Sequence, residues 1–219
     1  MQTGSLIMNP DPNTSAFYDQ YAAGISDETE SPRSAMLPHI EREIARGAAV
    51  LDVGAGSGRD MAAMLACGLD AFGVEPNEAM RAKALARHPA LHGRLRSAAL
   101  PALGLPFEDL RPQGFDAVVC SAVLMHLDAV EMPAALEAMV GQLRAAAGST
   151  LLLALPEMDR AWLKADRDRD DRKFHNHSPD DIRDILGRAG LVLERSFTSD
   201  IVLKSAGSLW HTLVFRRLR

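Results

Sequence analysis

The chain has 219 residues, of which 47% are hydrophobic, and this is enough to bury one good-sized core in a single domain. Its net charge is -5 and its pI is about 5.8, whereas nucleic-acid-binding proteins normally carry a basic face, so the composition argues against nucleic acid as a partner. The sequence has no apolar run of about eighteen residues and no signal-peptide pattern at its start, and we expect a cytoplasmic protein that does not associate with membranes.

The N-terminal segment precedes the first expected strand and is predicted to be largely helical. Residues 1–13, which end in a stretch of Asn, Asp and Pro, are expected to be a flexible leader. A helix is predicted over 14–23, with Thr14 or Ser15 as its N-cap, and a second helix follows a polar gap. Because both helices precede the first strand, we expect the segment 14–47 to form a lid over the mouth of the sheet.

Short apolar runs of strand length alternate with helical patterns through the rest of the chain. Strands are predicted over 50–53, 71–74, 115–121, 150–155, 191–197 and 209–215, and helices over 59–66, 77–87, 131–147 and 178–189. This alternation predicts an α/β, doubly wound, mostly parallel sheet in one domain. The connection between the last two strands is too short for a helical crossover, so these two strands are expected to pair as an antiparallel hairpin.

The segment VLDVGAGSGRD (50–60) places three alternating glycines between an expected strand and an expected helix. Glycine has no Cβ and tolerates positive φ, so the backbone here can approach a nucleotide-like ligand closely. A dinucleotide-binding G-x-G-x-x-G fingerprint would need its third glycine at Arg59. Asp52 stands just before the turn. Glu75 directly follows the next expected strand, about twenty residues after the turn, where a mononucleotide-binding half places an acid for the ribose hydroxyls.

These residues resemble the first motif of class I S-adenosylmethionine-dependent methyltransferases, of the bacterial small-molecule type. The similar pieces are FYDQYA (17–22), VLDVGAGSGRD (50–60), VEPNEAM (74–80), FDAVVCSAVLMHL (115–127), LLLALPE (151–157) and SPDDIRDILGRAGL (178–191). The resemblance covers roughly residues 14–217. It implies a Rossmann-like class I methyltransferase fold, with a seven-stranded, mostly parallel sheet, an antiparallel C-terminal strand and an N-terminal helical lid. The expected parts are a cofactor-binding core (48–155), a substrate-side segment (156–178) and a closing helix and hairpin (179–219).

The resemblance also implies a binding site for S-adenosylmethionine around the glycine turn. The backbone of Gly54, Ala55 and Gly56 would pack against the methionine portion, and Asp52 would hold its amino group. Glu75 would accept hydrogen bonds from both ribose hydroxyls, an arrangement that suits a carboxylate. The further contacts that it implies are at Pro76, Met80, Ser97, Ala98, Ser121 and Ala122.

Several of these contacts leave alternatives open. Met80 packs either on the adenine or in the core. The family usually has an acid where this chain reads Ser-Ala-Ala over 97–99, so Ser97 or a backbone carbonyl has to supply the contact to adenine N6. Tyr18 and Tyr21 either cover the sulfonium, to which an aromatic face is attractive, or pack between the lid helices. Arg33 is the candidate partner for the methionine carboxylate.

The acceptor side of the site is expected to carry histidines, the usual general bases near neutral pH. His126 follows the fourth strand, and the resemblance implies that it lies near the reaction centre or ties down its own loop. The charged run DRDRDDRK (166–173) is expected to be a solvated loop or helix face. The other candidates on this side are His175, Asn176 and His177, with Tyr18 closing the lid, and Asp200, Lys204 and Trp210 in the closing strands.

The sequence indicates no metal centre. Cys67 and Cys120 are expected to be buried free thiols, and no CxxC or Cys/His spacing typical of a metal site is present. The cofactor that the resemblance implies is S-adenosylmethionine, with S-adenosylhomocysteine as the product.

Three functional hypotheses remain. The first is methyl transfer to an O or N nucleophile of a small metabolite, as a step in biosynthesis. The acceptor would attack the methyl group in line, which needs correct positioning and a base. The enzyme would be a monomer or a homodimer. The second is a cyclase in which the α-amine of S-adenosylmethionine attacks its own γ-carbon, which gives azetidine-2-carboxylate and methylthioadenosine. The third is a nonenzymatic cofactor-binding or scaffolding protein. The net charge and the lack of an appended module argue against methylation of macromolecules.

Overall fold

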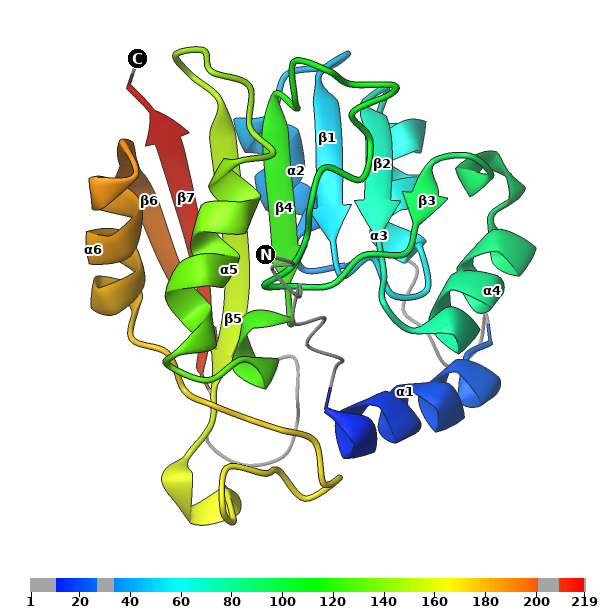
Figure 1. Ribbon diagram of the computed structural model, residues 1–219, viewed down its shortest axis with the longest axis vertical. Coiled ribbons are helices and arrows are strands. Elements are labelled where there is room, and N and C mark those ends of the chain that lie inside the picture. Colours follow the sequence, from blue (N-terminus) through cyan, green and yellow to red (C-terminus); the bar gives the residue numbers. More distant parts are fainter. Residues whose placement is uncertain (1–10, 27–33, 201–208, 219) are drawn as a thin grey trace, which may run out of the picture.

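Seven strands form one mixed sheet in the residues that the computed structural model describes, which are 11–26, 34–200 and 209–218 (Figure 1). The strands are β1 (Ala49–Val53), β2 (Asp70–Val74), β3 (Leu95–Arg96), β4 (Ala117–Ser121), β5 (Thr150–Glu157), β6 (Leu191–Asp200) and β7 (Leu209–Arg217). Their order is β3-β2-β1-β4-β5-β7-β6. β7 is antiparallel to β5 and to β6, and the other pairs are parallel. The sheet and the antiparallel hairpin are thus as predicted.

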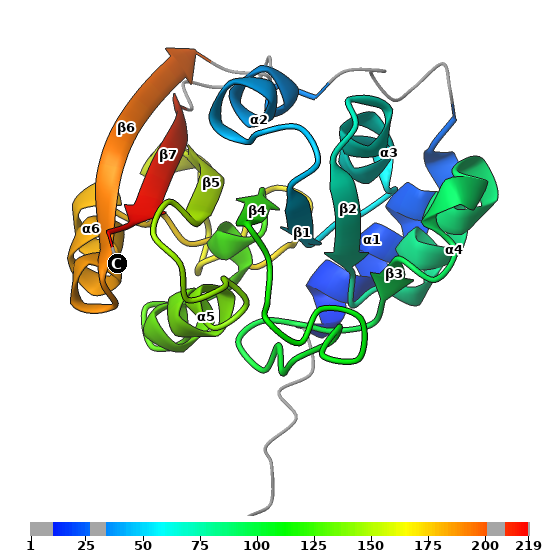
Figure 2. The ribbon, with the colours of Figure 1, turned by 90° about the horizontal axis from the view of Figure 1, so that it is seen from above.

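Helices cover both faces of this sheet (Figure 2). They are α1 (Pro12–Gly24), α2 (Leu37–Glu43), α3 (Arg59–Ala66), α4 (Glu78–Arg87), α5 (Glu131–Val140) and α6 (Pro179–Arg188), with short 3-10 turns at Pro89–Leu91, Leu124–His126 and Arg160–Trp162. Within the described ranges, no helix has both the length and the apolar character needed to cross a membrane.

Strand β4 shows why the buried strands are apolar along their whole length. Val118 and Cys120 lie in the core beneath α5 and α6, whereas Ala117 and Val119 lie in the core beneath α2 and α3. Successive side chains of a strand point to opposite faces, so a strand that is covered on both sides is apolar except near its ends. The apolar run predicted at 115–121 follows from this double coverage.

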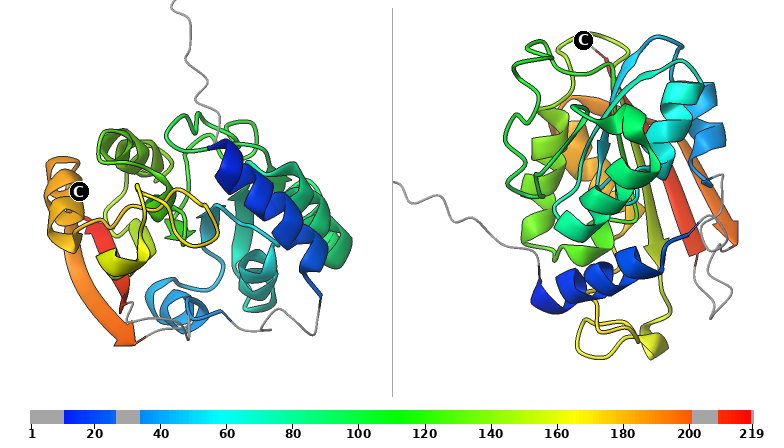
Figure 3. Two further views of the ribbon diagram at one scale, coloured as in Figure 1. Left: turned by 90° about the horizontal axis from the view of Figure 1, so that it is seen from below. Right: turned by 90° about the vertical axis from the view of Figure 1, so that its right-hand side faces the viewer.

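One edge of the sheet, where the parallel strands end, is crossed by α1 (Figures 1 and 3). The helix packs along α4, and Ala22 and Ile25 form a small cluster with Met80. The segment between β5 and α6 lies at the same edge (Figure 3). The carboxyl ends of the strands thus face a space bounded by α1 and this segment, which is where open α/β sheets bind ligands.

Three expectations for the elements are corrected. Helix α1 begins at Pro12, and its N-cap is Asp11, whose carboxylate accepts from the Thr14 N–H at 2.9 Å, so the leader does not extend to residue 13. Helix α2 packs on a face of the sheet through Ile40 and is not part of a lid. Helix α5 ends at Val140 instead of 147, because the Phe115 N–H donates to Gln142 O at 2.8 Å and draws the chain into a turn.

Candidate active site

A large cavity opens at the carboxyl edge of the sheet, with a volume of about 1440 Å³. Its walls come from α1 and from the loops that follow β1, β2, β3, β4 and β5. It therefore brings together parts of the sequence that lie more than 150 residues apart, such as Tyr18 and His175. Among the described residues, most of those expected to bind the cofactor or the acceptor line this cavity.

The glycine turn after β1 forms one wall. Gly54 has φ of +80°, and a Cβ added there would lie 2.2 Å from Val123 Cγ2, so no other residue fits without strain. The Gly54 N–H donates to Val74 O at 2.8 Å, which fixes the turn against the end of β2. The Gly56 N–H donates to the Glu75 carboxylate at 2.9 Å. The turn predicted from the sequence is thus tied to the acid that was predicted beside it.

Glu75 is buried, with 8% of its surface exposed, and it lines the cavity. Its second carboxylate oxygen accepts from the Asn77 N–H at 2.9 Å. Burial raises the pKa of Glu75, while the N–H groups of Asn77 and Gly56 and the charge of Arg81 oppose the rise. Each oxygen has a lone pair beyond the one used by the backbone. The side chain is therefore a preorganised acceptor for two hydroxyl groups.

Asp52, at the end of β1, is a second buried carboxyl in the same wall. Burial raises its pKa well above the usual range, and the charges of Asp60 and Glu75 add to this effect. A cationic group bound next to Asp52 would favour its ionised form and lower the pKa again. Arg59 and Asp60, at the start of α3, line the cavity beside it.

The opposite end of this wall is apolar. Met80 is buried, lines the cavity beside Pro76, and lies 3.4 Å from the position that a Cβ on Gly56 would take. Ala98 lines the cavity with Ala99 and Leu100, but Ser97 is exposed and lies outside the lining. The contact expected from Ser97 is corrected accordingly. The alternative contact, from a backbone carbonyl, stays a prediction.

The segment after β4 forms the third side. Ser121 and Ala122 line the cavity as predicted. Ala122 has φ of +58°, a left-handed conformation that turns the chain sharply into the 3-10 turn Leu124–His126. His126 on that turn lines the cavity, and its Nε2 lies 3.0 Å from the Tyr18 hydroxyl of α1.

The other two histidines have different environments. His175 lines the cavity, and its Nε2 is buried with no hydrogen-bond partner among the described residues. His177 lies outside the lining, and its Nε2 donates to Leu124 O at 3.0 Å and Leu127 O at 2.9 Å. Asn176 exchanges two hydrogen bonds with the backbone of Met158. His177 and Asn176 therefore hold the surrounding loops, and the expectation that they line the acceptor side is wrong.

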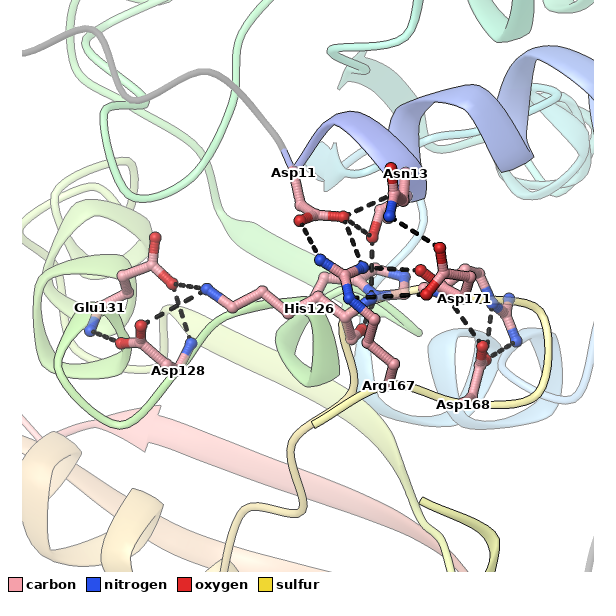
Figure 4. A network of polar contacts seen from close by, with 11 residues as sticks. Asp11, Asn13, His126, Asp128, Glu131, Arg167, Asp168 and Asp171 are labelled. Atoms are coloured by element: carbon pink, nitrogen blue, oxygen red, sulfur yellow. Dashed lines mark hydrogen bonds and ion pairs between the residues drawn. The ribbon is translucent and has the colours of Figure 1, made fainter. Parts of the chain in front are cut away.

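The charged run joins the start of α1 and becomes part of the site (Figure 4). Its contacts there are Arg167 with Asp11 (2.8 and 3.0 Å), Asp171 with Asn13 (2.7 Å), the Lys173 N–H with Thr14 Oγ1 (2.9 Å) and the Arg172 guanidinium over the Phe17 ring (4.5 Å). Asp168, only 7% exposed, pairs with Arg172 at 2.6 Å. The segment is thus partly buried against α1, and the expectation of a solvated loop is corrected.

The remaining candidates are distributed as follows. Tyr21 lines the cavity and is 48% exposed. Trp210 of β7 packs against the core beneath α2 and α3 and is not in the lining. Arg33 and Lys204 lie outside the described residues, and Asp200 is the last residue of β6. Of the closing-strand candidates, Trp210 is therefore excluded from the cavity.

Several lining residues were not anticipated. Asp19 on α1 accepts from Asn77 Nδ2 at 2.7 Å and so joins the lid helix to the acid-bearing loop. Arg172 and Lys173 line the cavity. The sequence could have indicated Asp19, because it directly follows the candidate residue Tyr18. Nothing in the run DRDRDDRK distinguishes Arg172 from its exposed neighbours.

The glycine turn, the acid after β2 and the antiparallel β7 together define the fold of the class I S-adenosylmethionine-dependent methyltransferases. Residues 50–146 match a family model described as a methyltransferase domain. These matches confirm the resemblance inferred from the sequence.

Solved structures share the fold over nearly the whole chain. They include the 1,6-didemethyltoxoflavin N1-methyltransferase of Burkholderia thailandensis (19% identity, TM-score 0.67, 94% of this chain and 85% of that chain). A magnesium protoporphyrin IX methyltransferase of Synechocystis (17%, 0.64, 94% and 85%) and a TehB-like methyltransferase of Corynebacterium glutamicum (19%, 0.64, 94% and 100%) are also similar. At these identities the likeness shows the fold. No curated protein matches the sequence.

Proposed function

We propose that this protein is an S-adenosylmethionine-dependent methyltransferase that methylates an oxygen or nitrogen atom of a small metabolite and releases S-adenosylhomocysteine. The observation that carries the proposal is the cavity itself, in which the glycine turn and Glu75 of the methyltransferase domain face Tyr18 and His126. The similar Burkholderia and Synechocystis enzymes were crystallised with S-adenosylhomocysteine, which supports the choice of cofactor.

The walls suggest how the cofactor lies. The ribose hydroxyls bond to Glu75, and the adenine packs between Met80 and the segment Ala98–Leu100. The methionine portion follows the backbone of Gly54–Gly56, with its ammonium group near Asp52, whose buried carboxyl gains from a nearby cation. Arg33 remains our proposed partner for the methionine carboxylate. Ser121 and Ala122 bound the sulfur end, and Tyr18 and Tyr21 cover the sulfonium.

The acceptor lies between α1, the 3-10 turn with His126 and the segment that ends at His175. Residues 48–155 are thus proposed to bind mainly the cofactor, with the turn at His126 also facing the acceptor, and residues 156–178 are proposed to lie on the acceptor side together with α1. The buried, unpartnered Nε2 of His175 supports the assignment, because a buried polar group without a partner is costly unless a ligand satisfies it. His175 is thus proposed to orient the acceptor.

The size of the cavity supports methyl transfer over cyclisation. Pockets for one small molecule usually have volumes of about 300–1,000 Å³, and this cavity, at about 1440 Å³, has room for a second molecule. A cyclase has to exclude external nucleophiles from its bound cofactor, whereas a methyltransferase has to admit one. The cyclase remains the alternative that product analysis tests.

The setting of the reaction is part of the same proposal. The net charge of -5 supports a small acceptor over a nucleic acid. We propose a bacterial biosynthetic enzyme that works in the cytoplasm as a monomer or homodimer.

Calorimetry with S-adenosylhomocysteine and with NAD⁺ tests the cofactor assignment. We expect saturable binding of S-adenosylhomocysteine at one site per chain and no binding of NAD⁺, since Arg59 occupies the place of the third glycine of a dinucleotide fingerprint. Binding of NAD⁺ in preference to S-adenosylhomocysteine would overturn the proposed function.

A further inference from the structure

Both ring nitrogens of His126 have partners, and these partners fix its tautomer. Nδ1 lies 2.7 Å from Lys173 O, and a carbonyl oxygen only accepts, so Nδ1 carries the hydrogen. Burial lowers the pKa of His126, against the opposing effects of Lys173 O and of the Asp168 and Asp11 carboxylates. The ring is therefore neutral near pH 7, its Nε2 is an acceptor, and the Tyr18 hydroxyl donates to it over 3.0 Å.

This arrangement decides which group faces an acceptor. His126 has no nitrogen left for a substrate, because one is bonded to the backbone and the other to Tyr18. The Tyr18 oxygen uses its hydrogen for His126 and accepts a hydrogen bond from the Arg172 side chain, but it keeps a further lone pair, and its side chain lines the cavity. The hydroxyl is thus the basic end of a hydrogen-bonded chain that runs from the cavity through His126 to Lys173 O.

We propose that Tyr18 Oη receives the proton of the methyl acceptor and passes its own hydroxyl proton to His126 Nε2 in the same step. The proposal rests on the proposed function. In this relay, Tyr18 contacts the substrate, His126 is the final proton acceptor, and Arg172 is a positioning residue.

The step balances. The bond between the acceptor atom and its hydrogen breaks, and that proton forms a bond with Tyr18 Oη. The Tyr18 O–H bond breaks as His126 Nε2 takes its proton and becomes an imidazolium. The freed electron pair of the acceptor atom forms the bond to the methyl carbon, and the C–S bond breaks with its electrons going to sulfur. The positive charge of the sulfonium is thus replaced by that of the imidazolium.

The surroundings favour a concerted transfer. Burial raises the pKa of Tyr18, so a tyrosinate does not form beforehand, while the charge of Arg172 and its hydrogen bond to Tyr18 oppose that rise and the charges of Glu75 and Asp168 add to it. The Arg172 guanidinium lies over the ring of Phe17, which is on the same helix as Tyr18, and it pairs with Asp168 at 2.6 Å. It therefore places a fixed positive charge beside the oxygen that becomes electron-rich during the step.

The relay also narrows the class of acceptor. A base is needed when the nucleophilic atom still carries its proton near neutral pH, as in a hydroxyl group or a ring N–H. A thiolate or a carboxylate has already lost it and would gain nothing from Tyr18. We therefore assign a neutral hydroxyl or N–H compound as the acceptor class.

The tautomer is tested first, on the full chain saturated with S-adenosylhomocysteine. ¹⁵N NMR of the imidazole groups at pH 7 is expected to show His126 neutral, with hydrogen on Nδ1 and none on Nε2. The opposite tautomer, or an imidazolium, would overturn the relay. Because this readout needs no acceptor, it fails separately from the proposed function, which fails if S-adenosylhomocysteine does not bind at all.

The roles are tested with variants, by measuring S-adenosylhomocysteine formation in a small-molecule cell extract together with binding of that product. Tyr18→Phe and His126→Gln are each expected to slow turnover by about 10²- to 10⁴-fold, the usual contribution of general acid–base catalysis, with affinity changed less than about 3-fold. Arg172→Gln is expected to lower turnover, because it removes the positive charge beside Tyr18. Arg172→Lys keeps that charge and should show part of the turnover that Arg172→Gln loses. The control His92→Gln changes an exposed histidine outside the cavity. Full turnover in Tyr18→Phe would refute the proposal.

Discussion

Replacing Glu75 by Ala is expected to weaken the binding of S-adenosylhomocysteine by about 30-fold or more, the equivalent of about 2 kcal/mol. Two charge-assisted hydrogen bonds to the ribose are lost, each worth about 1.5–3 kcal/mol at most. The same change releases the N–H groups of Gly56 and Asn77, which bond to the two carboxylate oxygens and order the loops around the ribose. Isothermal titration calorimetry of the variant measures the loss.

Glu78→Ala is the matched control for this variant. Glu78 lies three residues further on, at the start of α4, where it is exposed and outside the cavity lining. We expect its affinity for S-adenosylhomocysteine to equal that of the wild type. If Glu75→Ala bound the ligand as tightly as this control, the ribose would not lie where the account places it.

Gly54→Ala is expected to lower the free energy of unfolding by about 1–3 kcal/mol and to remove most of the cofactor affinity. The added methyl group would lie 2.2 Å from Val123 Cγ2, and the residue would have to keep φ near +80°. To relieve the steric clash or the backbone strain, the glycine turn has to move away from β2 or the segment after β4 has to shift. The turn and that segment both line the cavity. Urea denaturation and calorimetry measure the two effects.

Gly187→Ala supplies a control with the opposite sign. Gly187 lies within α6, has ordinary helical φ, and has no atom within 4 Å of an added Cβ. Alanine is favoured over glycine in a helix by about 0.5–1 kcal/mol, so this variant should be slightly more stable and bind normally. A Gly54→Ala protein as stable as the wild type would show that the turn is not constrained as described.

Much of the fold could be predicted because it depends on local patterns. The strands covered on both faces are short continuous apolar runs, and the glycine turn between β1 and α3 has a spacing that few other structures require. The end of α5 could not be read in this way. The end of α5 is determined by Phe115, which lies far from α5 in the sequence and whose N–H donates a hydrogen bond to Gln142 O.

The site divides in the same manner. Glu75 and the glycines belong to one local unit, and their positions follow from the order of strand, turn and helix. The acceptor side depends on how a charged loop folds back on α1. Arg167 and Arg172 bond to acids while their neighbour Arg169 is largely exposed, and sequence alone gives these arginines equal standing. His177 and His175 are separated by one residue, yet only His175 reaches the cavity, because His177 bonds to two backbone carbonyls.

Mass spectrometry of the products formed from S-adenosylmethionine tests the central claim most directly. The protein is incubated with the cofactor alone and with the cofactor plus a small-molecule cell extract, and heat-denatured protein serves as the inactive control. The account predicts S-adenosylhomocysteine and a methylated compound that form only when the extract and the wild-type protein are both present. Enzyme-dependent methylthioadenosine from the cofactor alone, above its spontaneous background, would contradict methyl transfer and identify the protein as a cyclase.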